Sequence, residues 1–150
     1  EIIVHPQSII HSMVEFIDGS IKAQLGEPSM TIPIHYALNY PKWKKSLMPK
    51  FNFLEKPSLT FEKPDLEKFR CIKLAYDALK LGGSYPLVLN VVNDICVNAF
   101  LNDKIKFIDI PNFIDDALQS HNACKIDDID SIFNIINSTK NIILRKLDSK

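Results

Sequence analysis

Four prolines within residues 41–64 constrain the fold of this chain more than any other feature. Proline fixes its own φ angle and has no backbone N–H to donate, so neither a helix nor a central strand can continue through prolines at this spacing. The four are Pro41, Pro49, Pro57 and Pro64. Apolar and aromatic side chains are interspersed among them, and we therefore expect a linker that packs against a surface.

Before the linker, the pattern predicts a β-hairpin followed by a short helix. Two apolar runs, residues 9–17 and 20–25, flank the pair Asp18-Gly19. An Asp-Gly pair between two such runs is a strong hairpin signal. Residues 29–40 begin with a serine that can cap a helix and carry a proline in the first turn, which together favour a helix.

The first residues read as a strand already under way. Residues 1–4 are Glu-Ile-Ile-Val, and an unpaired apolar strand needs a sheet to join. We therefore expect that the sequence was cut from a larger protein.

After the linker, apolar residues recur at helical spacing over residues 65–150. We expect four helices with short connections, which is the pattern of a small bundle. Residues 104–110 alternate and predict a short extended connector. The expected starts of the four helices are Asp65, Ser84, Asp109, and Asp127 or Asp128. The apolar stripe expected on the fourth helix is Ile129, Ile132, Ile136, Ile143 and Leu147.

Composition excludes several classes of protein. Apolar residues make up 46% and charged residues 24%, with a formal net charge of zero, which gives no reason to expect nucleic acid or an anionic membrane as a partner. No apolar run approaches the roughly 20 residues that span a bilayer. Cys71, Cys96 and Cys124 are odd in number and far apart, which favours a reducing compartment.

The residues by themselves indicate no reaction. The histidines have no carboxylate or cysteine at a metal-ligand spacing, so we expect no metal site in this chain. The acidic clusters Asp115-Asp116 and Asp127-Asp128-Asp130 stand at expected helix ends, where we expect them to cap N–H groups and complement the helix dipole.

One string carries a specific resemblance. His5 to Val14 reads HPQSIIHSMV, which resembles a motif of the 1-deoxy-D-xylulose-5-phosphate reductoisomerase family. Later segments agree in order and spacing to about residue 110, including LGEP-x-M at residues 25–30, LTF at 59–61 and CIKLA at 71–75. Some positions depart from the family pattern: Ser29, Tyr40, Arg70, and residues 90–94, which read Asn-Val-Val-Asn-Asp where the family typically has Asn-Ala-Ala-Asn-Glu.

The resemblance implies an α+β fold in three parts. Residues 1–40 would be the end of an α/β catalytic domain, residues 41–64 a packed linker, and residues 65–150 a C-terminal helical domain. It also implies an enzyme that rearranges 1-deoxy-D-xylulose 5-phosphate and reduces it with NADPH to 2-C-methyl-D-erythritol 4-phosphate, a precursor of isoprenoids. The metal, Mg²⁺ or Mn²⁺, would be bound by carboxylates upstream of residue 1, so this chain alone would be inactive.

The same resemblance implies a homodimer formed through residues 9–25. The richness of the chain in Ile, Asn and Lys suggests an AT-rich genome, and we therefore expect a bacterial cytoplasm, with a plastid-type organelle as the alternative. The rival hypothesis is a stand-alone, non-catalytic dimerisation or binding module of the same fold.

Four residues can be carried over from the family as candidate site residues. Ser8 and His11 would line the substrate pocket, and Pro28 and Met30 would border the nicotinamide. His11 would order the metal-binding carboxylates or the substrate through a hydrogen bond, or else be a structural histidine. Met30 would offer a soft thioether to a flat ring, or else be a core contact at the start of a helix.

Overall fold

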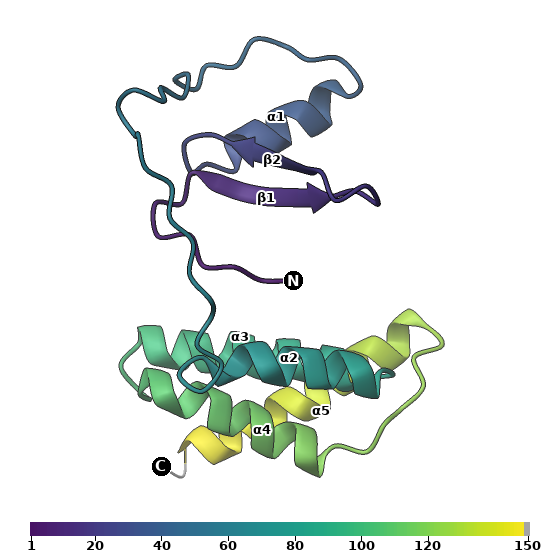
Figure 1. Ribbon diagram of the computed structural model, residues 1–150. Coiled ribbons are helices and arrows are strands. Elements are labelled where there is room, and N and C mark those ends of the chain that lie inside the picture. The colour runs from purple at the N-terminus through teal and green to yellow at the C-terminus, as the bar shows by residue number, and fades with distance from the viewer. Residues whose placement is uncertain (149–150) are drawn as a thin grey trace. The chain divides into compact units, whose positions relative to one another are not determined.

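The computed structural model describes residues 1–148 and consists of two compact units, Glu1–Pro64 and Asp65–Lys150. The first unit holds strands β1 and β2 and helix α1, and the second holds helices α2 to α5 (Figure 1). The described residues thus form a two-stranded hairpin and five α-helices, which confirms the predicted α+β class.

The hairpin is formed by β1 (Ile10–Glu15) and β2 (Ile21–Leu25), which pair antiparallel. Gly19 has a φ of 80°, a conformation that a glycine adopts without steric cost. The Asp18 carboxylate accepts hydrogen bonds from the amide and the hydroxyl of Ser20, at 2.9 and 2.6 Å. The hairpin predicted from Asp18-Gly19 is therefore confirmed.

The pairing of β1 with β2 is interrupted at His11. Ile10 pairs with Leu25 and Ser12 pairs with Gln24, so His11 is an extra residue that has no partner on β2. Such a bulge bends the strand and turns the side chain of the extra residue out of the regular alternation. His11 therefore departs from the regular alternation of side chains along a strand.

The expected strand at residues 2–4 is reduced to one residue. Val4 forms an isolated antiparallel bridge with Glu62, in which each amide N–H donates to the other residue's carbonyl at 3.0 and 2.9 Å. The predicted helix at 29–40 is confirmed as α1 (Thr31–Asn39), two residues shorter at its start. Ser29 still accepts a hydrogen bond from the Thr31 amide at 3.1 Å.

The linker packs over only part of its length. The Trp43 ring stacks on Tyr36 of α1, with 4.4 Å between ring centroids, and Lys56 forms an ion pair with Glu27 at 2.9 Å. In contrast, Leu47 and Leu54 are 102% and 90% exposed, so the expected packing does not extend to them.

The helical unit contains α2 (Arg70–Leu81), α3 (Tyr85–Leu101), α4 (Ile110–Ser120) and α5 (Ile129–Asp148). Helix α3 contacts each of the other three, which confirms the four-helix bundle. The connector before α4 is not extended as predicted, because Phe107–Asp109 forms a 3₁₀ turn.

Aspartate side chains accept backbone hydrogen bonds near the starts of α2 and α5. Helix α2 begins at Arg70 and not at Asp65, because the Asp65 carboxylate accepts from the amides of Glu67 and Lys68 and so caps a separate turn before the helix. For α5, the Asp128 carboxylate accepts from the Ser131 amide at 2.7 Å, as expected of a cap.

Arg70 connects two helices of the bundle. Its guanidinium donates to the Asn112 side-chain oxygen at 2.8 Å and to the Asp115 carboxylate at 3.0 Å, both on α4. Arg70 departs from the family pattern, and in this chain it gains partners on a neighbouring helix.

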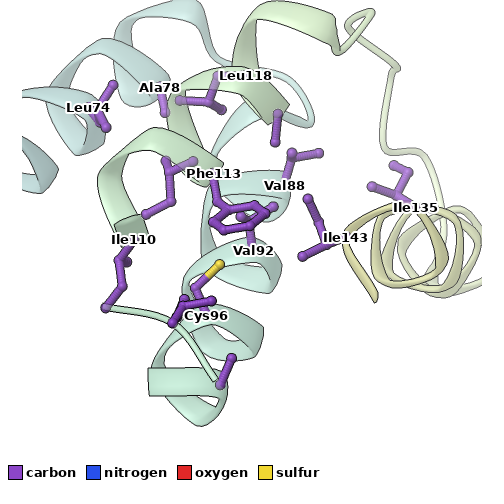
Figure 2. Close-up of a cluster of buried hydrophobic side chains, with 14 residues drawn as sticks. Leu74, Ala78, Val88, Val92, Cys96, Ile110, Phe113, Leu118, Ile135 and Ile143 are labelled. Atoms are coloured by element: carbon purple, nitrogen blue, oxygen red, sulfur yellow. The ribbon is translucent and has the colours of Figure 1, made fainter. Parts of the chain in front are cut away.

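The core of the bundle lies between all four helices, and α2 contributes Leu74 and Ala78 to it. Phe113 of α4 lies beside Val92 of α3, and Ile143 points toward them from α5 (Figure 2). Helix α5 buries Ile135, Thr139 and Ile143. Ile129, expected in its apolar stripe, is 69% exposed, because α5 begins there, before its buried face.

Candidate functional site

The candidate residue Ser8 lies in a tight turn just before β1. Its amide donates to the carbonyl of His5 at 3.0 Å, and its φ is 50°. A positive φ is uncommon for a residue with a side chain and requires support from its surroundings. Ser8 itself is exposed, whereas the next residue, Ile9, is 1% exposed and anchors the turn.

The turn is held on its other side by Thr60 of the linker. The Thr60 carbonyl oxygen accepts a hydrogen bond from Nδ1 of His5, at 2.8 Å. The Thr60 hydroxyl accepts from Nε2 of Gln7 at 2.7 Å, and the Thr60 amide donates to Oε1 of Gln7 at 3.2 Å. The His5 ring also stacks on Phe61, with 5.0 Å between ring centroids.

His11 connects β1 to the turn that follows β2. Its Nε2 lies 3.2 Å from the carbonyl oxygen of Gly26, and a carbonyl can only accept, so Nε2 carries the proton and Nδ1 is left as an acceptor. The Gly26 amide in turn donates to the carbonyl of Ile9 at 3.0 Å. The bulge at His11 is what directs the ring toward Gly26.

The other two candidates border a small apolar pocket. It has a volume of about 320 Å³, and His11, Pro28 and Met30 are among its lining residues, together with Ile32 and Pro33 of α1. Met30 is 70% exposed, so within this chain it is not a core contact. The ion pair of Lys56 with Glu27 holds the adjacent turn to the linker.

The structure thus brings His11, Pro28 and Met30 to one pocket and leaves Ser8 in the neighbouring turn. Sequence reasoning missed Gln7 and Thr60, although both lie in segments that carry the family resemblance. The interaction joins positions 53 apart, and no local pattern reports it.

No metal centre is formed by residues 1–148, since no three of their histidine, cysteine, aspartate and glutamate side chains gather closely enough to hold an ion. His5 and His11, the pair nearest in sequence, bind two different backbone carbonyls. Within the same residues, no helix is long and apolar enough to cross a membrane.

In the helical unit, Ser84 contacts His121, with Oγ and Nε2 2.6 Å apart. The Ser84 hydroxyl also accepts from the Cys124 amide at 2.9 Å. Ser84 is 0% exposed, so no substrate could reach this hydroxyl as a nucleophile. These hydrogen bonds therefore join the segment after α4 to the start of α3.

Comparison with known proteins decides the family. The family model described as "DXP reductoisomerase C-terminal domain" matches residues 25–142. This chain belongs to the DXP reductoisomerase family. A reductoisomerase of Chloroherpeton thalassium is 48% identical over 149 residues, which are 99% of this chain and 38% of that protein. A reductoisomerase of a Thermoanaerobacter species is 50% identical over 97% of this chain and 38% of its own length.

Solved reductoisomerase structures agree with the fold. The Zymomonas mobilis enzyme in complex with NADPH matches all of this chain and 40% of its own chain, with a TM-score of 0.92 and 39% identity. A second structure, in complex with NADPH, fosmidomycin and magnesium, matches 97% of this chain and 38% of its own, with a TM-score of 0.88 and 36% identity. The chain therefore spans about two fifths of the length of the reductoisomerases that it matches.

Proposed function

We propose that this chain is the C-terminal part of an enzyme that rearranges 1-deoxy-D-xylulose 5-phosphate and reduces it with NADPH to 2-C-methyl-D-erythritol 4-phosphate, a step of isoprenoid precursor synthesis by the non-mevalonate route. The observation that carries the proposal is the match to reductoisomerases over nearly the whole chain, at 48% and 50% identity. The test is NADPH consumption by the full-length protein, followed by absorbance, with substrate and Mg²⁺. A full-length protein that leaves NADPH unconsumed would contradict the proposal.

In this enzyme, Ser8 would contact the substrate from the turn before β1. Its exposed position and its fixed backbone both support this role. His11 would hold the pocket in place through its hydrogen bond to Gly26, with Nδ1 left as an acceptor toward a donor on the substrate or on the protein.

Pro28 and Met30 would border the nicotinamide of NADPH, the group that supplies the hydride when it is bound. The pocket beside them has about 320 Å³ and an apolar lining, which suits one face of a planar ring and not a whole dinucleotide. The remainder of the cofactor would therefore be bound by other parts of the full-length protein.

The divalent metal, Mg²⁺ or Mn²⁺, would also be held elsewhere. Two solved reductoisomerases that resemble this chain are complexes with magnesium. The side chains of residues 1–148 do not fit such an ion, because they offer no cluster of ligands. We therefore propose that the isolated 150-residue chain does not consume NADPH with substrate and Mn²⁺, and turnover by that chain would refute this.

The hairpin would join two subunits of a homodimer through residues 9–25. It exposes an unusual amount of apolar surface, since Val14, Ile17 and Ile21 are 58%, 109% and 59% exposed. Patches of this kind on a soluble protein mark interaction sites. Sedimentation of the full-length protein should give a dimer, and Val14→Lys should shift it toward the monomer. Ile129→Lys, at an exposed apolar position of the bundle, is the matched control.

The rival function is a stand-alone dimerisation or binding module without catalysis. It predicts the same dimer but no NADPH consumption by any form of the protein. We propose the bacterial cytoplasm as the site of action, and fractionation of the source cells would test it.

A further inference from the structure

Thr60 is the residue of the linker that engages the turn of Ser8 most fully. Its carbonyl, its hydroxyl and its amide all bind the same turn, through the His5 ring and both ends of the Gln7 amide. A reciprocal pair of hydrogen bonds to one carboxamide fixes both the distance and the rotation between two segments. Thr60 therefore defines where the turn lies relative to the rest of the first unit.

The isolated bridge beyond Thr60 fixes the register of this contact. Val4 and Glu62 exchange two backbone hydrogen bonds, and the rings of His5 and Phe61 are stacked. A slip by one residue would break both interactions, because successive side chains of an extended segment point to opposite faces. Thr60 is consequently held opposite Gln7, the residue that directly precedes Ser8.

The backbone of Ser8 needs such support. Its φ of 50° lies in the left-handed region, which a serine keeps only where the surroundings determine it. Support after Ser8 comes from Ile9, which is 1% exposed. Support before Ser8 comes from the hydrogen bonds of His5 and Gln7 to Thr60. Residues 5–7 belong to a turn and lie in neither a helix nor a strand, so regular backbone pairing does not hold them.

We propose that Thr60 is a positioning residue for Ser8, so that the linker sets the affinity of the enzyme for its phosphosugar substrate without touching it. The inference rests on the proposed function, because it requires Ser8 to contact the substrate. Thr60 itself is exposed, and replacing its hydroxyl removes no core packing. The effect should therefore appear in substrate binding and hardly in stability.

The test uses the full-length protein and steady-state kinetics with varied substrate. Thr60→Val removes the hydroxyl and keeps the size of the side chain. It should raise KM for the substrate about tenfold, which is the lower end of the roughly 10–100-fold effect of residues that orient a ligand-contacting group. The value of kcat should change less, and Thr60→Ser should restore the wild-type KM. Gln7→Met removes the other side of the contact and should reproduce the Thr60→Val effect.

A double-mutant cycle with Ser8→Ala separates positioning from a general structural role. If Thr60 acts through Ser8, Ser8→Ala with Thr60→Val should have the KM of Ser8→Ala alone, because the two changes are not independent. Ile143→Val in the bundle core is the control that lowers the melting temperature without touching the turn. Its KM should stay at the wild-type value.

The outcomes distinguish the two proposals. A full-length protein without turnover would overturn the proposed function and this inference with it. Three outcomes with normal turnover would overturn the positioning role and leave the proposed function standing. They are an unchanged KM in Ser8→Ala, an unchanged KM in Thr60→Val, and fully additive effects in the double variant.

Discussion

The hydroxyl of Ser84 and the imidazole of His121 lie 2.6 Å apart, although 37 positions separate them in the sequence. Tyr85 reinforces the contact, because its hydroxyl donates to the carbonyl of His121 at 3.1 Å and its ring meets the imidazole edge to face. This cluster closes the segment between α4 and α5 onto the start of α3.

The first prediction concerns the pH dependence of stability. Burial lowers the pKa of His121 below the ordinary 6.5, because the charged imidazolium loses its hydration in the folded protein. The unfolded chain therefore binds a proton at a higher pH than the folded chain does. The neutral imidazole of His121 therefore contributes its full share to the stability of the fold above pH 6.5. This contribution is lost as the pH falls through the lower pKa of His121 in the folded state. The melting temperature should drop as the pH falls below 6.5.

The same melting series with His121→Gln provides the comparison for this prediction. Glutamine does not titrate, so the melting temperature of this variant should depend less on pH below 6.5 than that of the parent chain. Equal slopes in the two proteins would show that His121 is not responsible.

The second prediction concerns the hydroxyl of Ser84. Ser84→Ala removes the partner of both His121 Nε2 and the Cys124 amide. Losing these two partly buried hydrogen bonds should lower the free energy of unfolding by about 1–3 kcal/mol. Urea denaturation measures this value. Ser120→Ala, which removes an exposed hydroxyl that bonds only within its own helix, should cost about 0.5 kcal/mol or less.

The third prediction concerns His11 in the full-length protein. His11→Leu removes the donor to the Gly26 carbonyl and should lower kcat/KM by about 10–100-fold, as expected for a residue that orients a site. His11→Gln can still present an N–H to Gly26 and should recover part of the loss. The melting temperature should change little in both variants. A variant that melts several degrees lower with near-normal kcat/KM would assign His11 to packing instead.

The fourth prediction ranks the reactivity of the cysteines. Cys124 is exposed, Cys71 is half-buried and Cys96 is buried. Burial raises the pKa of the Cys71 thiol, and the nearby Arg70 guanidinium opposes that shift only in part, so little thiolate forms at neutral pH. Alkylation of the native chain at pH 7.5, followed by mass spectrometry, should modify Cys124 first. Labelling of Cys96 before Cys124 would contradict the packing of the bundle.

Local sequence determined the elements whose cause lies within a few residues. Asp18-Gly19 specified the hairpin turn, and Gly82-Gly83 ended α2 with two positive φ angles. The Asp128 carboxylate began α5 by the short-range hydrogen bond expected of a cap. Each interaction spans at most a few positions, and a pattern of residue types therefore predicts it.

The helix propensity of residues 65–69 was overridden by an equally local alternative. The Asp65 carboxylate binds amides two and three residues ahead and closes a turn, and the helix starts only at Arg70. The connector over 104–110 is a similar case, because the Lys106 amide donates to the Asp109 carboxylate and the Asp109 amide donates to the Lys106 carbonyl, which closes a 3₁₀ turn.

The sequence by itself determined the family, the α+β class and the order of the elements, because motifs and short-range signals are written in consecutive residues. Only the tertiary structure decided that His11 is a bulge residue bonded to Gly26, that Thr60 binds the turn of Ser8, and that Ser84 binds His121. These contacts join residues 15, 53 and 37 positions apart. Such pairings depend on how the whole chain is packed, and neither partner carries a local pattern that specifies the other.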